Sequence, residues 1–186
     1  NIMNDGSKKV VILLAHPNLK ESQANKALAD AVKDIDGVMV YDLYEYQDQS
    51  FDVNLWSTII SDASMIIFQF PFYWMSAPSL LKRWLDEVFT SLAKTPAVAG
   101  KPLQIVTTTG SEYAAYRSGG RNGFTMDELL RPYQGCAIHA GMTWHTPLVV
   151  YGIGSADASR NIVAGAEAYK QRVEAALTDH TMQNIW

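Results

Sequence analysis

A cluster of large flat side chains follows an apolar run near the middle of the chain. Residues 65–70 (MIIFQF) read as a buried strand, and Pro71, which has no backbone N–H, predicts where it ends. Three aromatic residues and a methionine come next, at residues 72–75 (FYWM). Aromatic rings at the carboxyl end of a buried strand lie where open α/β sheets bind flat cofactors. Such clusters more often pack in a core or a subunit interface, so this segment alone identifies no ligand.

Two further loops carry polar groups suited to a nucleotide. The first contains His16 and leads to a helix start at Ser22 and Asn25, where backbone and side-chain donors suit a phosphate. The second, residues 107–111 (TTTGS), is small enough for backbone amides to approach a ring edge and stabilise the charge of a reduced flavin. Each has an ordinary alternative: a strand-end histidine, a helix N-cap and a polar turn. Together with the aromatic segment they favour a nucleotide with a flat ring.

Strand and helix patterns alternate along the chain. Strands are expected at residues 9–15, 38–43, 64–70, 103–108 and 142–151, and helices at residues 22–35, 54–62, 79–93, 124–130 and 157–177. A Gly-rich segment, residues 117–123 (RSGGRNG), precedes the fourth helix. Strands separated by helices form a parallel sheet covered on both faces. The sequence therefore predicts an α/β fold: a three-layer, doubly wound, five-stranded parallel sheet in the flavodoxin-like order, which brings the three loops to one edge.

The bulk composition fits one ordinary domain of the 186 residues. We expect that domain at residues 9–180, with an expression remnant or flexible N-terminus at residues 1–8 and a tail at residues 181–186. The net charge of −4 gives no reason to expect nucleic acid as a partner. One cysteine, Cys136, suits a reducing compartment, and no apolar run is long enough to span a bilayer. These features favour a cytoplasmic protein, with a peripheral position at the inner face of the membrane left open.

Two weaker motifs carry little weight. Residues 152–155 (GIGS) match part of a dinucleotide fingerprint, but Asp157 stands where its last glycine belongs, so a helix start explains the segment better. The histidines at positions 139, 145 and 180 lack the spacing of a metal site, and no metal is expected.

The sequence resembles the flavin-dependent NAD(P)H quinone oxidoreductases of the DT-diaphorase type over residues 10–177. The most specific segments are AHP followed by SQAN, then FQFPFYWMSAPSLLKRWLDEVF, VTTTG and NGFTMDELLRPYQ. The short bacterial members are the most similar, and these include ancillary subunits of glutathione-regulated potassium efflux systems. The resemblance implies a flavodoxin-like fold and a bound flavin.

The resemblance also implies a role for each loop. Around the flavin phosphate and ribityl chain it places His16, Ser22, Gln23, Ala24 and Asn25. Against the isoalloxazine it places Pro71, Phe72, Tyr73, Trp74 and Met75, and at the polar edge of the ring Thr108, Thr109, Gly110 and Ser111. Tyr116 matches a family tyrosine near the flavin carbonyls and is the expected catalytic residue. Larger members add a histidine six residues later, where this chain has Asn122, so a Tyr–His proton relay is not assumed.

The expected activity is that of an NAD(P)H dehydrogenase (quinone). Hydride passes from NAD(P)H to the flavin and two electrons then pass to a quinone or similar flat acceptor, in a ping-pong sequence, because no separate nicotinamide domain is evident. FMN is the expected cofactor and FAD the alternative, since the family members associated with FAD are generally longer. The choice between NADH and NADPH stays open.

Two expectations concern partners. A homodimer is expected because residues 72–75 carry more apolar surface than a flavin face covers. The alternative function is that of a regulatory ancillary subunit of a glutathione-gated potassium efflux transporter.

A one-electron carrier is disfavoured. The flavin loops of such a carrier would be acidic, whereas the predicted flavin loops of this chain carry only Glu21 and Glu112.

Overall fold

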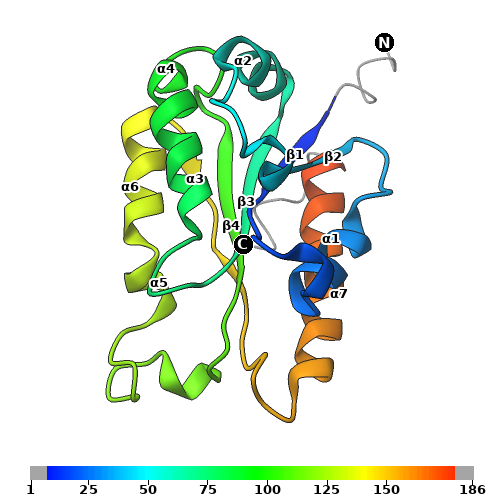
Figure 1. The fold of residues 1–186 in the computed structure, drawn as a ribbon, viewed down its shortest axis with the longest axis vertical. Helices are drawn as coiled ribbons and strands as arrows, with labels where there is room; N and C mark the ends of the chain where they lie inside the picture. Colours follow the sequence, from blue (N-terminus) through cyan, green and yellow to red (C-terminus); the bar gives the residue numbers. More distant parts are fainter. Residues whose placement is uncertain (1–7, 179–186) are drawn as a thin grey trace.

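The computed structural model describes residues 8–178, which form three layers: a parallel sheet with helices on each of its two faces (Figure 1). The strands, in chain order, are β1 (Val10–Leu14), β2 (Val38–Asp42), β3 (Met65–Pro71), β4 (Pro102–Thr108), β5 (Thr143–Trp144) and β6 (Leu148–Val150). They run in the order β2-β1-β3-β4-β5, and β6 also pairs with β4. Every pairing is parallel, so the predicted doubly wound sheet in flavodoxin-like order is confirmed.

Helices cover both faces of the sheet because each buries one apolar stripe (Figure 1). One face is covered by α1 (Ala24–Val32) and α7 (Ala158–Thr178). The other is covered by α2 (Val53–Asp62), α3 (Ser79–Trp84), α4 (Thr90–Leu92), α5 (Met126–Leu129) and α6 (Arg131–Ala140). Short 3₁₀ turns occur at η2 (Leu19–Glu21), η3 (Leu43–Tyr46) and η5 (Tyr113–Ala115). β1 and β3 are buried along their whole length, as their continuous apolar sequences predict.

Local sequence explains where several helices begin and end. The Asp52 carboxylate accepts hydrogen bonds from two backbone N–H groups in the first turn of α2. Thr125 and Glu128 form a capping box that starts α5. α6 ends at Gly141, whose φ of 81° lies in the left-handed region that glycine adopts readily. The helix that begins at Ser79 contains a π-turn, η4 (Leu85–Phe89), before it continues as α4.

Two predicted elements differ from the structure. The fifth strand, expected at residues 142–151, is split into β5 and β6, and Pro147 lies in the interruption, where it offers no N–H to the ladder. The helix expected at residues 124–130 is only the short α5, and α6 was missed. Gly135 and the small residues around it weaken the helical pattern of α6 in the sequence. The helix is stabilised instead by its packing against the sheet. The expectations for residues 1–7 and 181–186 lie outside the described residues.

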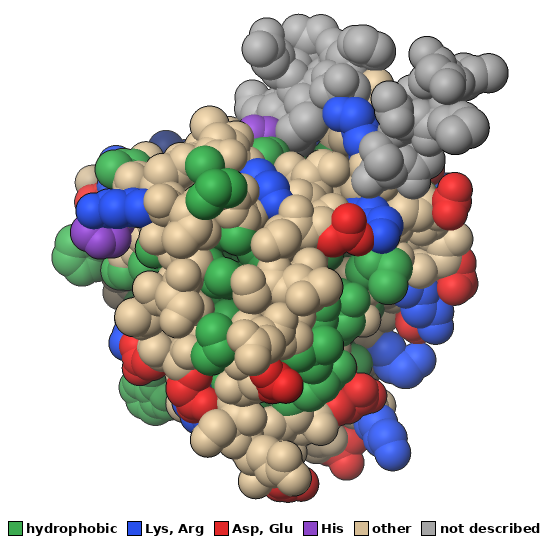
Figure 2. Space-filling model, turned by 90° about the horizontal axis from the view of Figure 1, so that it is seen from above, with side chains coloured by type: hydrophobic (Ala, Val, Ile, Leu, Met, Phe, Trp, Pro, Cys, Tyr) green, Lys and Arg blue, Asp and Glu red, His purple; other side chains and the backbone are tan. Residues whose placement is uncertain are grey.

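Charge is mixed on the end of the molecule that carries α2 and α4. Figure 2 shows basic and acidic side chains interspersed there, with no large patch of one sign on that face. Within residues 8–178, no helix combines the length and the hydropathy that crossing a membrane requires.

Candidate functional site

The three loops predicted to form the site meet at one edge of the sheet, because β1, β3 and β4 are neighbours with their carboxyl ends aligned. The His16 ring lies 6.3 Å from the Tyr73 ring, centroid to centroid, which joins the first loop to the aromatic one. The Phe72 N–H donates to the Thr108 carbonyl at 2.9 Å, which joins the aromatic loop to the third. The fold therefore brings together the side chains of three loops that are far apart in the sequence.

The first loop presents free backbone donors at the start of α1. The Asn25 N–H donates to Ser22 Oγ at 3.0 Å, which is the N-cap bond that a serine before a helix often makes. The N–H groups of Gln23 and Ala24 have no partner within residues 8–178. Two adjacent unpaired amides at the positive end of a helix make a site for an anion. His16 Nδ1 accepts from the Asn18 N–H at 2.9 Å, and burial lowers the pKa of this imidazole.

Asn25 points inward and joins two loops through a buried network. Its side chain is 1% exposed and Nδ2 donates to Thr108 Oγ1 at 3.1 Å. Gln69 Nε2 donates to the Asn25 backbone carbonyl at 3.0 Å, and the Tyr169 hydroxyl donates to Gln69 Oε1 at 3.0 Å. Burial raises the pKa of Tyr169 far above its usual range, so its hydroxyl stays protonated and can donate. Asn25 thus holds the start of α1 against the end of β4.

The aromatic loop is a tight, strained turn. Tyr73 and Ser76 exchange both backbone hydrogen bonds, at 2.8 and 2.9 Å, and the two residues between them have positive φ: 48° at Trp74 and 65° at Met75. Two central residues with φ above zero define a type I′ turn, which favours Asn-Gly. A non-glycine residue in this region costs about 1–2 kcal/mol. Trp74 is 96% exposed, so burial within the chain does not offset that cost, and strain of this kind is typical of functional sites.

Tyr133 on α6 anchors this turn, and sequence reasoning missed it. Its hydroxyl lies 3.1 Å from Ser76 Oγ and accepts from the Ala77 N–H, also at 3.1 Å. Burial raises the pKa of Tyr133, which keeps the hydroxyl neutral. The residue lies within the segment NGFTMDELLRPYQ that carried part of the resemblance, so a signal was present, although the helix that positions it was not predicted.

Residues 152–155 hold the third loop in place. This is the segment (GIGS) that partly matches a dinucleotide fingerprint in sequence. Gly154 N–H donates to the Gly110 carbonyl at 3.0 Å, and Gly152 N–H donates to the Ser111 carbonyl at 2.9 Å. A Cβ on Gly154 would lie 3.2 Å from the Gly110 oxygen, so the close approach explains the glycine. The N–H groups of Gly110 and Ser111 have no partner in the part of the chain that the structure describes. Two backbone donors are therefore available at this edge of the site.

Tyr116 is 6% exposed and lies between two other rings. Its centroid is 6.2 Å from Phe72 and 6.0 Å from Tyr151. Burial, with a smaller contribution from Tyr113, raises the pKa of Tyr151 to about 12, so that hydroxyl stays neutral at physiological pH. Tyr116 thus connects the aromatic loop to the β6 side of the molecule.

Neither a metal centre nor a reactive thiol is apparent among the described residues. Residues 8–178 contain no group of three or more His, Cys, Asp or Glu side chains arranged to hold a metal ion. Cys136 is half-buried on α6, and burial raises the pKa of its thiol, which disfavours the nucleophilic thiolate. The chemistry that the site offers is therefore anion binding, ring stacking and hydrogen bonding from fixed amides.

Comparisons with known proteins agree with this geometry. Residues 8–173 match the family model described as Flavodoxin-like fold. The chain is 35% identical over 175 residues to the glutathione-regulated potassium-efflux system ancillary protein KefG of Yersinia pestis (strain Pestoides F), covering 91% of this chain and 96% of that protein. It is similar to the crystal structure of general stress protein 14 in complex with FMN from Treponema denticola, with a TM-score of 0.82, 30% identity, and 90% and 99% of the two chains covered. It is also similar to an NADPH-quinone reductase from P. pentosaceus, with a TM-score of 0.73, 30% identity and coverage of 86% and 96%.

Proposed function

This chain belongs to the flavodoxin-like fold family, and from that premise we propose that it is an FMN-dependent NAD(P)H dehydrogenase acting on a quinone or a similar flat acceptor. One observation carries the proposal: free helix-start amides, a strained aromatic turn and free loop amides converge at one edge of the sheet. The likeness to an FMN-bound protein and to an NADPH-quinone reductase supports it. FAD is the alternative cofactor.

The described residues fit a flavin mononucleotide. The N–H groups of Gln23 and Ala24 would bind its phosphate, and the exposed side chains of residues 73–75 would flank its ring. When bound, the flavin supplies a ring that accepts hydride from one substrate and passes two electrons to another. The amides of Gly110 and Ser111 would stabilise negative charge on the reduced ring, the kind of preorganised donor worth about 3 kcal/mol. Tyr116 would add a hydroxyl donor at the same edge.

The aromatic turn also supports a homodimer. Tyr73, Trp74 and Met75 are 43%, 96% and 47% exposed, which is unusual for side chains of this size. A second copy of the chain that covers part of this surface would close the substrate side of the pocket and exclude water from the ring. The homodimer and a cytoplasmic location belong to the proposal.

A second candidate function is regulation of a potassium efflux transporter. The similarity to KefG over almost the whole chain favours it. The two functions are compatible, since a flavin enzyme can bind a membrane partner. Activation of efflux by a catalytically dead variant, together with co-purification with transporter-containing membranes, would establish this role.

The test of the proposed enzyme is FMN titration followed by steady-state kinetics. We expect saturable FMN binding at micromolar concentration and NAD(P)H-dependent quinone reduction by the loaded protein. Varying quinone at several fixed donor concentrations should give parallel double-reciprocal lines, because donor and acceptor use one stacking site in turn. Absence of FMN binding would overturn the proposed function, and intersecting lines would exclude the single-site sequence.

A further inference from the structure

The Gly-rich segment, residues 117–123, forms a loop that is fixed to the rest of the site. The Asn122 N–H donates to the Ala115 carbonyl at 3.0 Å, and the Gly120 N–H donates to the Arg117 carbonyl at 2.8 Å. A Cβ on Gly120 would lie 2.4 Å from the Ala114 carbonyl oxygen, so only glycine permits this contact. The glycines therefore hold the loop against η5 and give its side chains a defined position.

Two arginines on this loop, Arg117 and Arg121, are not paired with a carboxylate among the described residues. Arg121 Nη2 donates to Ser111 Oγ at 3.0 Å, and the Arg117 guanidinium lies 5.4 Å above the Tyr113 ring. Neither forms an ion pair within residues 8–178, whereas Arg83 and Arg160 are each paired with a carboxylate. Both loop arginines are exposed. They place two unneutralised positive charges beside the third loop, in a chain whose net charge is −4.

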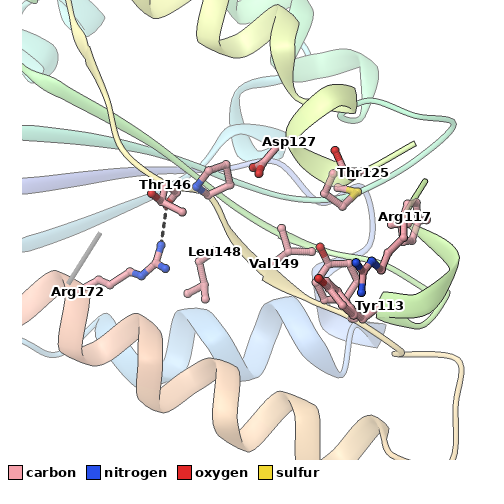
Figure 3. Close-up of a pocket in the computed structure, with 12 residues that line it drawn as sticks. Tyr113, Arg117, Thr125, Asp127, Thr146, Leu148, Val149 and Arg172 are labelled. Carbon is pink, nitrogen blue, oxygen red and sulfur yellow. Dashed lines mark hydrogen bonds between the residues drawn. The ribbon is translucent and has the colours of Figure 1, made fainter. Parts of the chain in front are cut away.

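A cavity of about 430 Å³ is lined in part by Arg117 (Figure 3). Arg121 does not line it, and contacts Ser111 of the third loop instead. In Figure 3 the Tyr113 and Arg117 side chains lie at one end, Arg172 lies at the other, and Leu148 and Val149 of β6 lie between. Asp127 contributes one carboxylate to the wall. Tyr116 also lines the cavity and contacts Phe72 of the aromatic loop, so the cavity adjoins the flavin site. Its volume is in the range of small-molecule sites.

We propose that Arg117 and Arg121 bind phosphate groups of the nicotinamide dinucleotide donor, whose adenosine end occupies this cavity. The inference rests on the proposed function: a donor whose nicotinamide ring stacks on the flavin and whose adenosine end occupies the cavity would carry its phosphates past the third loop. Guanidinium groups suit phosphate because their planar fork donates two parallel hydrogen bonds. The exposed Tyr113 ring offers a face on which adenine can stack. The phosphate is either the pyrophosphate common to both donors or the 2′-phosphate of NADPH.

The experiment uses Arg117→Gln, Arg121→Gln and the double variant, with Arg131→Gln as the matched control. Arg131 is an exposed arginine on α6 whose side chain donates to Gln134 and to no other group within residues 8–178. Unlike Arg117 it does not line the cavity, and unlike Arg121 it does not contact the third loop. We expect the double variant to raise the KM of the donor about tenfold, whereas Arg131→Gln should keep the KM, kcat and FMN affinity within twofold of the parent. Isothermal titration with 2′,5′-ADP and with ADP gives a readout independent of turnover, and both arginines should be needed for full affinity.

The two phosphate sources give different results. If the 2′-phosphate is bound, the losses are confined to NADPH and 2′,5′-ADP. If the pyrophosphate is bound, the KM of NADH rises as much as that of NADPH, and the affinity for ADP falls. Unchanged KM values and fragment binding in the double variant would overturn the inference, as would an equal loss in Arg131→Gln. A parent that binds FMN but oxidises neither donor would instead overturn the proposed function.

Discussion

The Tyr169 hydroxyl donates to Gln69 Oε1 at 3.0 Å, across 100 residues of sequence and at the centre of the molecule. Both side chains are completely buried. Gln69 in turn donates to Asn25, and Asn25 donates to Thr108. The chain of hydrogen bonds therefore connects the closing helix to two of the loops that form the candidate site.

Replacing Tyr169 by Phe should destabilise the domain by about 1–3 kcal/mol, because Gln69 Oε1 would stay buried without its donor. Urea unfolding followed by circular dichroism measures the change. Tyr46→Phe is the control, since Tyr46 packs on Trp56 through its ring and should lose less than about 0.5 kcal/mol. Equal stability of the Tyr169 variant and the parent would show that the hydrogen bond contributes nothing net.

Gln23→Pro should weaken FMN binding about five- to tenfold without loss of stability. Gln23 has φ of −80° and Ser22 has ψ of 129°, which suit a proline and the residue before it. The substitution removes one free amide donor from the proposed phosphate site. Gln23→Ala loses the same side chain but keeps the N–H, so it should bind FMN like the parent. Fluorescence titration compares the three proteins, and equal affinities would remove this amide from the site.

Trp74→Asn combined with Met75→Gly should stabilise the fold by about 1–2 kcal/mol, because Asn-Gly suits a type I′ turn. Quinone reduction should fall sharply, since the flanking side chains are lost. Trp74→Ala separates the two effects, because it removes the ring and keeps an L-residue at positive φ. Thermal unfolding and light scattering on all three report stability and association. A loss of stability in the Asn-Gly variant would mean that these side chains pack rather than bind.

The flavin-free protein should lose stability as pH falls below about 6.5. Burial lowers the pKa of His16, and burial with nearby Arg172 lowers that of His145. Each binds fewer protons when folded than when unfolded, so stability rises with pH through this window and is lost on acidification. His16→Asn keeps an acceptor for the Asn18 N–H but does not titrate, and should therefore reduce the slope. An unchanged slope between pH 5 and 6.5, measured by urea unfolding, would contradict the assignment to His16.

Tyr116→Phe should slow flavin reduction by NAD(P)H about tenfold, if its hydroxyl meets the charge that develops on the ring. Stopped-flow absorbance measures the step directly, and FMN titration on the same variant should give an affinity within about twofold of the parent. A reduction rate equal to the parent's would leave the Gly110 and Ser111 amides as the donors at that edge.

The sequence by itself determined the order of the sheet and which loops share an edge. The continuous apolar runs of β1 and β3 require burial on both faces, and the intervening helices require parallel strands, so His16, Phe72 and Thr108 must lie near one another. The three loops could be recognised because their residue types already suited phosphate, ring and ring edge.

Only the tertiary structure decided which groups at that edge are free. Asn25 is predicted from sequence to lie at the flavin, and only the structure shows that its side chain donates to Thr108 and that its backbone carbonyl accepts from Gln69. Residues 152–155 suggested a weak dinucleotide motif and instead brace the third loop. The anchoring of the aromatic turn by Tyr133 depends on α6, a helix whose local pattern is weak. Local sequence permits several conformations of these segments, and hydrogen bonds between distant segments stabilise one of them. These features therefore could not be derived from residue spacing alone.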